Sequence, residues 1–268
     1  MLHFIPTPIG NLEDISRRSI TLLANSTIVF CEDTRVTKRL ISLLKERYEA
    51  DFLDKDFISL HSHNEKAVLA KTDVSIFEQD VVYLSDAGMP AVSDPGCVLV
   101  NFCHENGIKY EVLPGANAAL LAYASSGFCE TQFLFFGFLP HKGNDRTNAL
   151  TKALNSGYVT ILYESPHRIE KLVNELSLKA PTRDIFLIKE ATKMYERHFK
   201  GTSLEVKNQL ENQNIKGEWV VVLNALKKEF GVITVDDIIA LDIPKKQASK
   251  LIAKITGKSP KECYNELL

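Results

Sequence analysis

The longest loop with residue types suited to ligand binding follows the short apolar run Val81–Leu84. It reads Ser-Asp-Ala-Gly-Met-Pro-Ala-Val-Ser-Asp-Pro-Gly over residues 85–96. The run itself is rich in β-branched and aromatic residues, which is typical of a buried strand. Small residues after a strand let a ligand approach backbone N–H and C=O groups closely, so the loop predicts a binding site. The alternative is an ordinary helix start, with Ser93 or Asp94 as N-cap and Pro95 in the first turn.

Ionisable side chains follow three other apolar runs. The loops after these runs carry Glu32-Asp33-Thr34-Arg35, Glu164-Ser165-Pro166-His167-Arg168 and Lys189-Glu190. Carboxylates and imidazoles are the side chains that most often transfer protons in catalysis. Arginine and lysine bind phosphates and stabilise oxyanions. For each of these side chains, a helix cap or a structural ion pair is an equally good interpretation.

Motifs for metals and for common nucleotide cofactors are missing from the sequence. His61 and His63 lie two residues apart, but no third ligand is near them in the sequence. The five cysteines have no CxxC spacing, so neither a zinc site nor a disulfide framework is predicted. No G-x-G-x-x-G follows the first apolar run, and no G-x-x-x-x-G-K-[ST] is present. We therefore expect a site without a metal, and neither a nicotinamide dinucleotide nor a P-loop nucleotide.

A regular alternation of strand and helix patterns must position these loops. Five strands are predicted in the first 115 residues, at Leu2–Ile5, Thr27–Cys31, Ile58–His61, Val81–Leu84 and Lys109–Leu113. Helical patterns separate them, including one over about residues 65–79. Such alternation predicts a parallel sheet with helices on its faces. Ligands bind at the carboxyl ends of the strands in such sheets, where the loops described above begin.

A second sheet is predicted after Gly127, where the pattern resets. Its strands are at Phe133–Leu139, Val159–Tyr163, Asp184–Ile188 and Trp219–Leu223. The fold class is therefore α/β, with a first domain over residues 1–115 and a second, mostly β sheet with helices, over 116–226. Residues 227–268 have sparser apolar positions in helical spacing, which predicts a small helical extension.

Charge is distributed unevenly along the 268-residue chain. Its 45% hydrophobic and 25% charged residues, with no leader pattern and no apolar run near 18 residues, predict a packed cytoplasmic protein without a membrane span. The net charge of −2 disfavours a strongly basic nucleic-acid protein, so RNA binding would need a local patch. Residues 243–261 hold six lysines and no acid, with Lys246, Lys250 and Lys254 on one helix face. This basic extension is either a solvated surface or a contact for phosphates.

Six loop motifs together resemble a single protein family. In chain order they are PTPIGN at residues 6–11, EDTR at 32–35, SDAGMPAVSDPG at 85–96, LPGANA at 113–118, FFGFLP at 135–140 and YESPHR at 163–168. They are similar to the bacterial ribosomal RNA small-subunit methyltransferase I group of the tetrapyrrole methylase superfamily. The resemblance extends from Leu2 to Leu226. Met89 departs from it, because threonine is expected at that position.

The resemblance implies a fold, a reaction and a cofactor site. Members of the superfamily hold S-adenosylmethionine in the cleft between two α/β domains, commonly in a homodimer. Members of the group methylate the ribose 2′-hydroxyl of a cytidine in the decoding region of 16S ribosomal RNA, so the implied partner is that RNA or the assembled 30S subunit. The implied cofactor-binding positions are Pro8, Ile9, Asp86, Gly88, Met89, Pro90, Val92, Asn117, Ala118, Leu162 and Tyr163.

Methyl transfer to a hydroxyl suggests roles for the ionisable loop residues. The hydroxyl must be held behind the methyl carbon, and a base or an oxyanion stabiliser helps because the hydroxyl is a poor nucleophile. We expect Ser165 to cap a helix with Pro166 in its first turn, so that His167 and Arg168 bind RNA phosphate while Glu164 anchors the loop or polarises the hydroxyl. The catalytic candidates are Glu32, Arg35, Glu164, His167, Arg168 and Lys189.

Two other functions stay open on the sequence alone. A tetrapyrrole or other small-molecule methyltransferase would share the cofactor cleft but would not need phosphate contacts. A non-catalytic RNA-binding protein would not need the cofactor loops. The basic segment over residues 243–261 and the positions of Arg35, Arg168 and Lys189 favour an RNA substrate.

Overall fold

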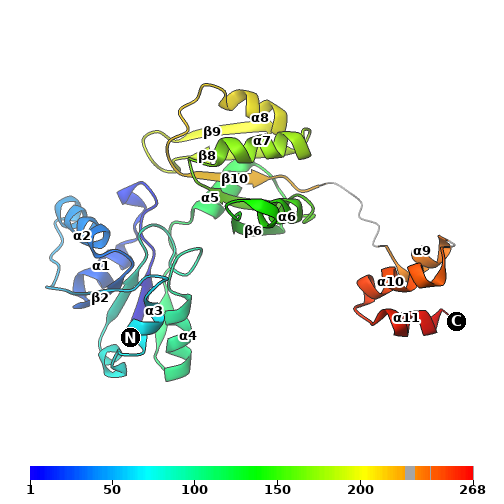
Figure 1. The fold of residues 1–268 in the computed structure, drawn as a ribbon. Helices are drawn as coiled ribbons and strands as arrows, with labels where there is room; N and C mark the ends of the chain where they lie inside the picture. Colours follow the sequence, from blue (N-terminus) through cyan, green and yellow to red (C-terminus); the bar gives the residue numbers. More distant parts are fainter. Residues whose placement is uncertain (227–232, 242, 268) are drawn as a thin grey trace. The chain divides into compact units, whose positions relative to one another are not determined.

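Two structural units make up the described part of the chain. The structure is a computed structural model that describes residues 1–226, 233–241 and 243–267. The units are Met1–Leu226, which contains both sheets, and Lys227–Leu268, which contains three short helices (Figure 1).

The first sheet has five parallel strands in the order β3-β2-β4-β1-β5. The strands are β1 (Leu2–Ile5), β2 (Ile28–Cys31), β3 (Asp56–Ser59), β4 (Val81–Leu84) and β5 (Tyr110–Val112). In the register, Leu2 of β1 lies opposite Val81 of β4 and Tyr110 of β5. The predicted parallel sheet is confirmed, and the loops after β1, β4 and β5 therefore begin at one edge.

Helices cover both faces of this sheet. Helices α1 (Arg17–Asn25) and α2 (Thr34–Tyr48) pack on the face that includes Ile5, Val82 and Leu84. Helices α3 (Glu65–Leu69) and α4 (Cys97–Asn106) pack on the opposite face, as Figure 1 shows, together with the 3₁₀ helix η2 (Val74–Glu78). A further 3₁₀ helix, η1, spans Leu12–Asp14.

The single helix predicted over about residues 65–79 is wrong. The segment divides into α3 and η2, because Asp73 is extended and its carboxylate accepts a hydrogen bond from Ser75 N at 3.0 Å. Aspartate competes well for backbone N–H groups in this way, so it starts a new helix more readily than it continues one. The short α3 leaves Glu65 at its first turn, buried under the β4 loop.

The second sheet is mixed and has the order β6-β7-β10-β8-β9. Its strands are β6 (Phe133–Phe138), β7 (Val159–Glu164), β8 (Asp184–Lys189), β9 (Arg197–Thr202) and β10 (Trp219–Leu223). Strands β6 and β7 are parallel, and the other pairs are antiparallel. Sequence patterns missed β9, because only Phe199 of its six residues is buried and the strand has no apolar run.

Helices also cover both faces of the second sheet. Helix α5 (Ala118–Ser126) packs on one face through the small residues Ala119 and Ala122. Helices α6 (Gly143–Leu154), α7 (Ile169–Lys179) and α8 (Ser203–Leu210) pack on the other face, and α7 and α8 lie side by side in Figure 1. Only five residues separate the end of β5 from the start of α5, so the N-terminal end of α5 lies beside the loops of the first sheet.

The C-terminal unit is a set of three helices around a small core. They are α9 (Val235–Ala240), α10 (Lys245–Thr256) and α11 (Pro260–Glu266). The core consists of Ile238, Ala248, Ile252 and Cys263. Among the helices that the structure describes, none is long and apolar enough to cross a membrane.

Candidate active site

The loops after β1 and β4 are joined by backbone hydrogen bonds at the carboxyl edge of the first sheet. Thr7 N donates to Gly88 O at 2.9 Å, and Gly88 N donates to Thr7 O at 3.0 Å. Gly88 has φ of +80°, and an added Cβ would lie 3.2 Å from Cγ2 of Ile9. Only glycine adopts this conformation without cost, so the bridge fixes an open stretch of backbone beside Ile9.

The rest of the β4 loop is held in an uncommon conformation. Ala91 and Ser93 both have positive φ, at 64° and 66°. Gly96 N donates to Oε1 of the buried Glu65 at 2.7 Å. Gly96 is also the N-cap position of α4, with no side-chain cap, so the alternative that Ser93 or Asp94 caps this helix is wrong. Non-glycine residues with positive φ persist where the surrounding structure enforces them, and they cluster at functional sites.

A pocket of about 320 Å³ lies between this edge and the second sheet. Its volume is at the lower end of the range of about 300–1,000 Å³ that is usual for small-molecule sites. Residues from the first-sheet loops and the start of α5 form one wall: Ile9, Ala87, Gly88, Met89, Val92, Ser93, Asp94, Asn117 and Ala118. Residues from the second sheet and its loops form the other: Phe138, Tyr163, Glu164, Ser165, Pro166, Ile188, Ala191, Glu218, Trp219 and Val220.

The direction of β10 explains why its first residues reach the pocket. Trp219 lies opposite Glu164, the last residue of β7, and opposite Lys189, the last residue of β8. Because β10 is antiparallel to both strands, its amino end shares the edge with their carboxyl ends. Glu218 and Trp219 lie before and at the start of a strand rather than after one, so the pattern of loops that follow strands did not reveal them.

Seven of the eleven implied cofactor-binding residues line the pocket: Ile9, Gly88, Met89, Val92, Asn117, Ala118 and Tyr163. The other four do not line it: Pro8, Asp86, Pro90 and Leu162. Leu162 is fully buried on the opposite face from Tyr163, because side chains alternate along a strand. Asp86 instead ties the β4 loop to the β2 loop, since its carboxylate accepts from Asp33 N at 3.1 Å.

Asp94, on the first wall of the pocket, is surrounded by other carboxylates. Burial, together with the negative charges of Glu32, Asp86 and Glu218, raises the pKa of Asp94 to about 7. Burial also raises the pKa of Glu32 and that of Asp86. Asp94 belongs to the Ser-Asp-Pro-Gly end of the loop over residues 85–96. Its position before Pro95 suggested a helix cap, so it was not among the predicted site residues.

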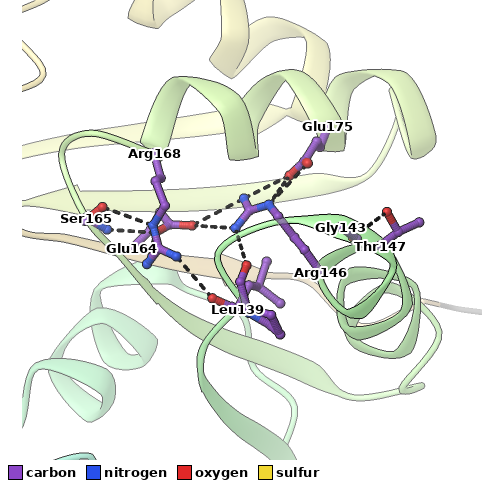
Figure 2. A network of polar contacts seen from close by, with 9 residues as sticks. Leu139, Gly143, Arg146, Thr147, Glu164, Ser165, Arg168 and Glu175 are labelled. Carbon is purple, nitrogen blue, oxygen red and sulfur yellow. Dashed lines mark hydrogen bonds and ion pairs between the residues drawn. The ribbon is translucent and has the colours of Figure 1, made fainter.

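Glu164 is the centre of a buried ion-pair network behind the second wall (Figure 2). Its side chain is fully buried and lies 3.3 Å from Arg146 Nη1 and 2.7 Å from Arg168 Nη2. Ser165 N donates to the same carboxylate at 2.9 Å. The two arginines also donate to the carbonyl oxygens of Pro140 and Leu139, at 3.2 Å each. The network therefore ties the end of β6 to the end of β7, where both strands reach the pocket.

Arg168 occupies the N-cap position of α7, which begins at Ile169. The predicted cap at Ser165 with Pro166 in the first turn is therefore wrong. Residues 165–168 form a turn instead, in which Arg168 N donates to Ser165 O at 3.0 Å. Arg168 is bound to Glu164, the structural ion pair that was the alternative to a role in catalysis.

The remaining catalytic candidates lie outside the pocket lining. Lys189 is buried and donates to Asn214 O at 2.5 Å, with its ammonium 5.9 Å from the Trp219 ring centre. Arg35 is 89% exposed and binds Asp33 at the start of α2. Glu32 accepts from Asp86 N at 3.3 Å, and His167 is exposed. Of the six candidates, only Glu164 lines the pocket.

No metal-binding group is present in the described ranges 1–226, 233–241 and 243–267. Within them, no three His, Cys, Asp or Glu side chains are arranged to hold a metal ion. The rings of His61 and His63 are 6.0 Å apart, and His61 accepts a hydrogen bond from His63 N.

Comparison with known proteins identifies a family over most of the chain. Residues 1–207 match the family Tetrapyrrole (Corrin/Porphyrin) Methylases. The chain is 51% identical over 270 residues to the ribosomal RNA small subunit methyltransferase I of Campylobacter fetus subsp. fetus (strain 82-40), and the match covers 100% of both chains. It is 39% identical to the protein of that name from Helicobacter pylori (strain J99 / ATCC 700824), covering 100% of this chain and 97% of that one.

Solved structures of low sequence identity share the fold. Uroporphyrin-III C-methyltransferase of Thermus thermophilus, in complex with S-adenyl homocysteine, has a TM-score of 0.56 at 15% identity and covers 82% of this chain and 96% of that chain. Diphthine synthase has a TM-score of 0.59 at 17% identity and covers 83% and 89%. These likenesses support the two-sheet fold.

Proposed function

Because the chain belongs to the tetrapyrrole methylase family and, within it, to the ribosomal RNA small subunit methyltransferase I group, we propose that it methylates small-subunit ribosomal RNA from S-adenosylmethionine. The proposed acceptor is the ribose 2′-hydroxyl of a cytidine in the decoding region. The proposed setting is the cytoplasm, where ribosomal subunits are assembled, and a homodimer stays a prediction that sedimentation can test.

The observation that carries the proposal is the composition of the pocket. Its first wall offers the open backbone at Gly88 and the apolar side chains of Ile9, Met89 and Val92. An elongated ligand with a purine and a short amino-acid chain suits apolar walls with a few fixed polar groups. When bound, S-adenosylmethionine supplies a methyl group on a positively charged sulfur. The carboxylates of Asp94 and Glu218 on facing walls favour that positive charge.

The chain's own residues would position the acceptor and exclude water. The β4 loop is fixed by Glu65 and by the bridge to Thr7, so it can hold a ligand without moving. The wall formed by Glu164, Ser165 and Pro166 is fixed by the buried arginines behind it. Two rigid walls hold reacting atoms in line, which can supply much of the rate acceleration of a displacement.

Metal-free binding is the first expected result. Calorimetry should give the same dissociation constant for S-adenosylmethionine with and without a chelator, because the pocket offers backbone and apolar groups. A dissociation constant that rises after chelation, and falls again when a divalent metal is added back, would contradict this expectation.

The basic face of α10 supports RNA as the substrate. Lys246, Lys250 and Lys254 are exposed, and none of them has an ion-pair partner among the residues that the structure describes. Changing all three to glutamine should weaken RNA binding and reduce the slope of log affinity against log salt, because each lysine that contacts a phosphate releases a counterion. Binding of S-adenosylmethionine should stay unchanged, since the pocket lies in the other unit.

A matched variant controls for the loss of charge alone. Lys71, Lys152 and Lys179 are also exposed, and changing these three to glutamine removes the same charge from the Met1–Leu226 unit. If both triple variants reduce the salt slope equally, or if neither does, the α10 face is a solvated surface rather than an RNA contact.

The substrate class is tested by offering several acceptors at once. Methyl-labelled S-adenosylmethionine should label 30S subunits or their bare RNA and leave a tetrapyrrole unlabelled. Label in the tetrapyrrole alone would favour the small-molecule methyltransferase. Binding of RNA without transfer to any acceptor would favour the non-catalytic alternative.

A further inference from the structure

We propose that Asp94 is the general base of the reaction, and that its carboxylate accepts the proton of the acceptor hydroxyl. The proposal rests on the proposed function, because a base is needed only if the acceptor atom carries a proton that it must lose. In the step, the O–H bond breaks and its proton moves to Asp94. The oxygen forms a bond to the methyl carbon, the carbon–sulfur bond breaks, and sulfur keeps the electron pair as a neutral thioether. Asp94 then releases the proton to water.

The position of Asp94 is the first argument. It lines the pocket together with Val92 and Ser93, close to the open backbone at Gly88. Burial raises the pKa of Tyr163, which lines the opposite wall, and that of Tyr83 in β4, and the charge of Asp94 adds to both increases. The charge of Asp94 therefore acts across the pocket on Tyr163, where a methyl donor and its acceptor would meet.

The conformation of the β4 loop is the second argument. Ala91 and Ser93 are non-glycine residues with positive φ, one of them next to Asp94 in the chain. The loop is closed by a hydrogen bond from Ala91 N to Pro95 O at 3.0 Å and held from below by Glu65. Such strain costs free energy, and a loop that needed only to start α4 would not require it. The strained loop gives Asp94 one fixed direction, as a proton acceptor needs.

Elimination among the pocket carboxylates is the third argument. Three carboxylates line the pocket within the described residues, namely Asp94, Glu164 and Glu218. Glu164 is bound to two arginines and to Ser165 N. Glu218 is 76% exposed and pairs with Lys193 at 2.8 Å. Asp94 alone of the three has no hydrogen-bond or ion-pair partner in the ranges that the structure describes, so its oxygens are free to accept a proton.

The charges around Asp94 set its working range. Glu32 after β2, Asp86 after β4 and Glu218 before β10 are the charged groups that act on it, and all three are acidic. Together with burial they raise its pKa to about 7, so the group is a stronger base than an ordinary aspartate and is largely ionised above pH 7.

The raised pKa of Asp94 also affects stability. Because the pKa in the folded state is raised, the protonated form is favoured by folding. The contribution of protonated Asp94 to stability is fully present below the pKa that the group has in the unfolded chain, and it is lost as the pH rises through about 7.

The variants Asp94→Asn and Asp94→Glu test the proposal in the full-length protein with 30S subunits as acceptor. In the wild type, kcat/KM should fall with a slope of one below about pH 7. Asp94→Asn should lower kcat by about 100-fold or more and remove this slope. Asp94→Glu should recover part of kcat. The Asn variant should melt at the same or a higher temperature than the wild type at pH 8, because it removes a buried charge that opposes folding.

Several results would contradict the proposal, and each excludes a different part of it. The assignment of Asp94 is overturned if the wild type is active and the kcat of the Asn variant at saturating substrate is within threefold of the wild-type value. The assignment is also overturned if the Asn variant regains full activity at high S-adenosylmethionine concentration, because Asp94 would then act in cofactor binding. It is overturned as well if the Asn variant melts at a much lower temperature than the wild type at pH 8, because Asp94 would then have a structural role. A wild type that transfers no methyl group to 30S subunits or RNA overturns the proposed function itself, and the base with it.

Discussion

Replacing Gly88 by valine should weaken binding of S-adenosylmethionine by roughly 100-fold or more, which corresponds to about 2.7 kcal/mol. Two effects add together. The φ of +80° is strongly unfavourable for a β-branched residue, and the first carbon of the new side chain would lie 3.2 Å from Ile9 Cγ2. The backbone of the pocket wall must then move, or the side chain must occupy space beside the ligand. Calorimetry on the folded variant measures the loss.

Gly107 provides a matched control for the backbone effect. It has φ of +65° at the end of α4, but an added Cβ there would have no atom of the described residues within 4 Å. Gly107→Val therefore has a similar conformational cost, without the close contact found at Gly88 and at a residue that does not line the pocket. We expect a lower melting temperature in both variants and a loss of ligand affinity only in Gly88→Val. Equal affinities in the two variants would remove Gly88 from the binding site.

Replacing Arg146 by alanine should lower the free energy of unfolding by about 3–5 kcal/mol, the usual cost of removing one partner of a buried ion pair. Arg146 is 2% exposed, and its partner Glu164 is fully buried. The substitution also removes a hydrogen bond to Pro140 O and the pair with Glu175 at 2.9 Å. Urea unfolding of the wild type and the variant measures the difference.

Arg168 gives the comparison within the same network. It is 17% exposed and shares Glu164 with Arg146, so Arg168→Ala should cost less stability than Arg146→Ala. If Arg168 also binds RNA, turnover should fall more than the loss of folded protein explains, with S-adenosylmethionine binding unchanged. Full specific activity in the remaining folded fraction would leave Arg168 a purely structural role. Equal unfolding free energies for the wild type and Arg146→Ala would contradict the network in Figure 2.

The sheets could be predicted from sequence where strands are buried. Val81–Leu84 and Trp219–Leu223 are continuous apolar runs, and the structure has strands at these bounds. Strand β9 could not be predicted, because it is an edge strand with only Phe199 buried and reads as a polar loop. The spacing of apolar residues also could not predict local hydrogen bonds, such as the one by which Asp73 divides one predicted helix into two.

The candidate site was predictable where it follows strand ends in the chain. The loop with Gly88 was found in this way, whereas Asn117 and Tyr163 were implied by the family resemblance. Glu218 was missed because the direction of β10 depends on pairing with strands far away in the sequence. Spacing likewise could not reveal that Glu164 is enclosed by arginines, one of them 18 residues earlier in the chain.

Mapping the transferred methyl group tests the central claim most directly. The protein is incubated with methyl-labelled S-adenosylmethionine and 30S subunits from cells that lack it, and the RNA is digested to nucleosides and mapped. We predict that the label appears as 2′-O-methylcytidine at one position in the decoding region. Label on a base rather than a ribose, or label absent from the RNA of subunits that the protein binds, would contradict the account.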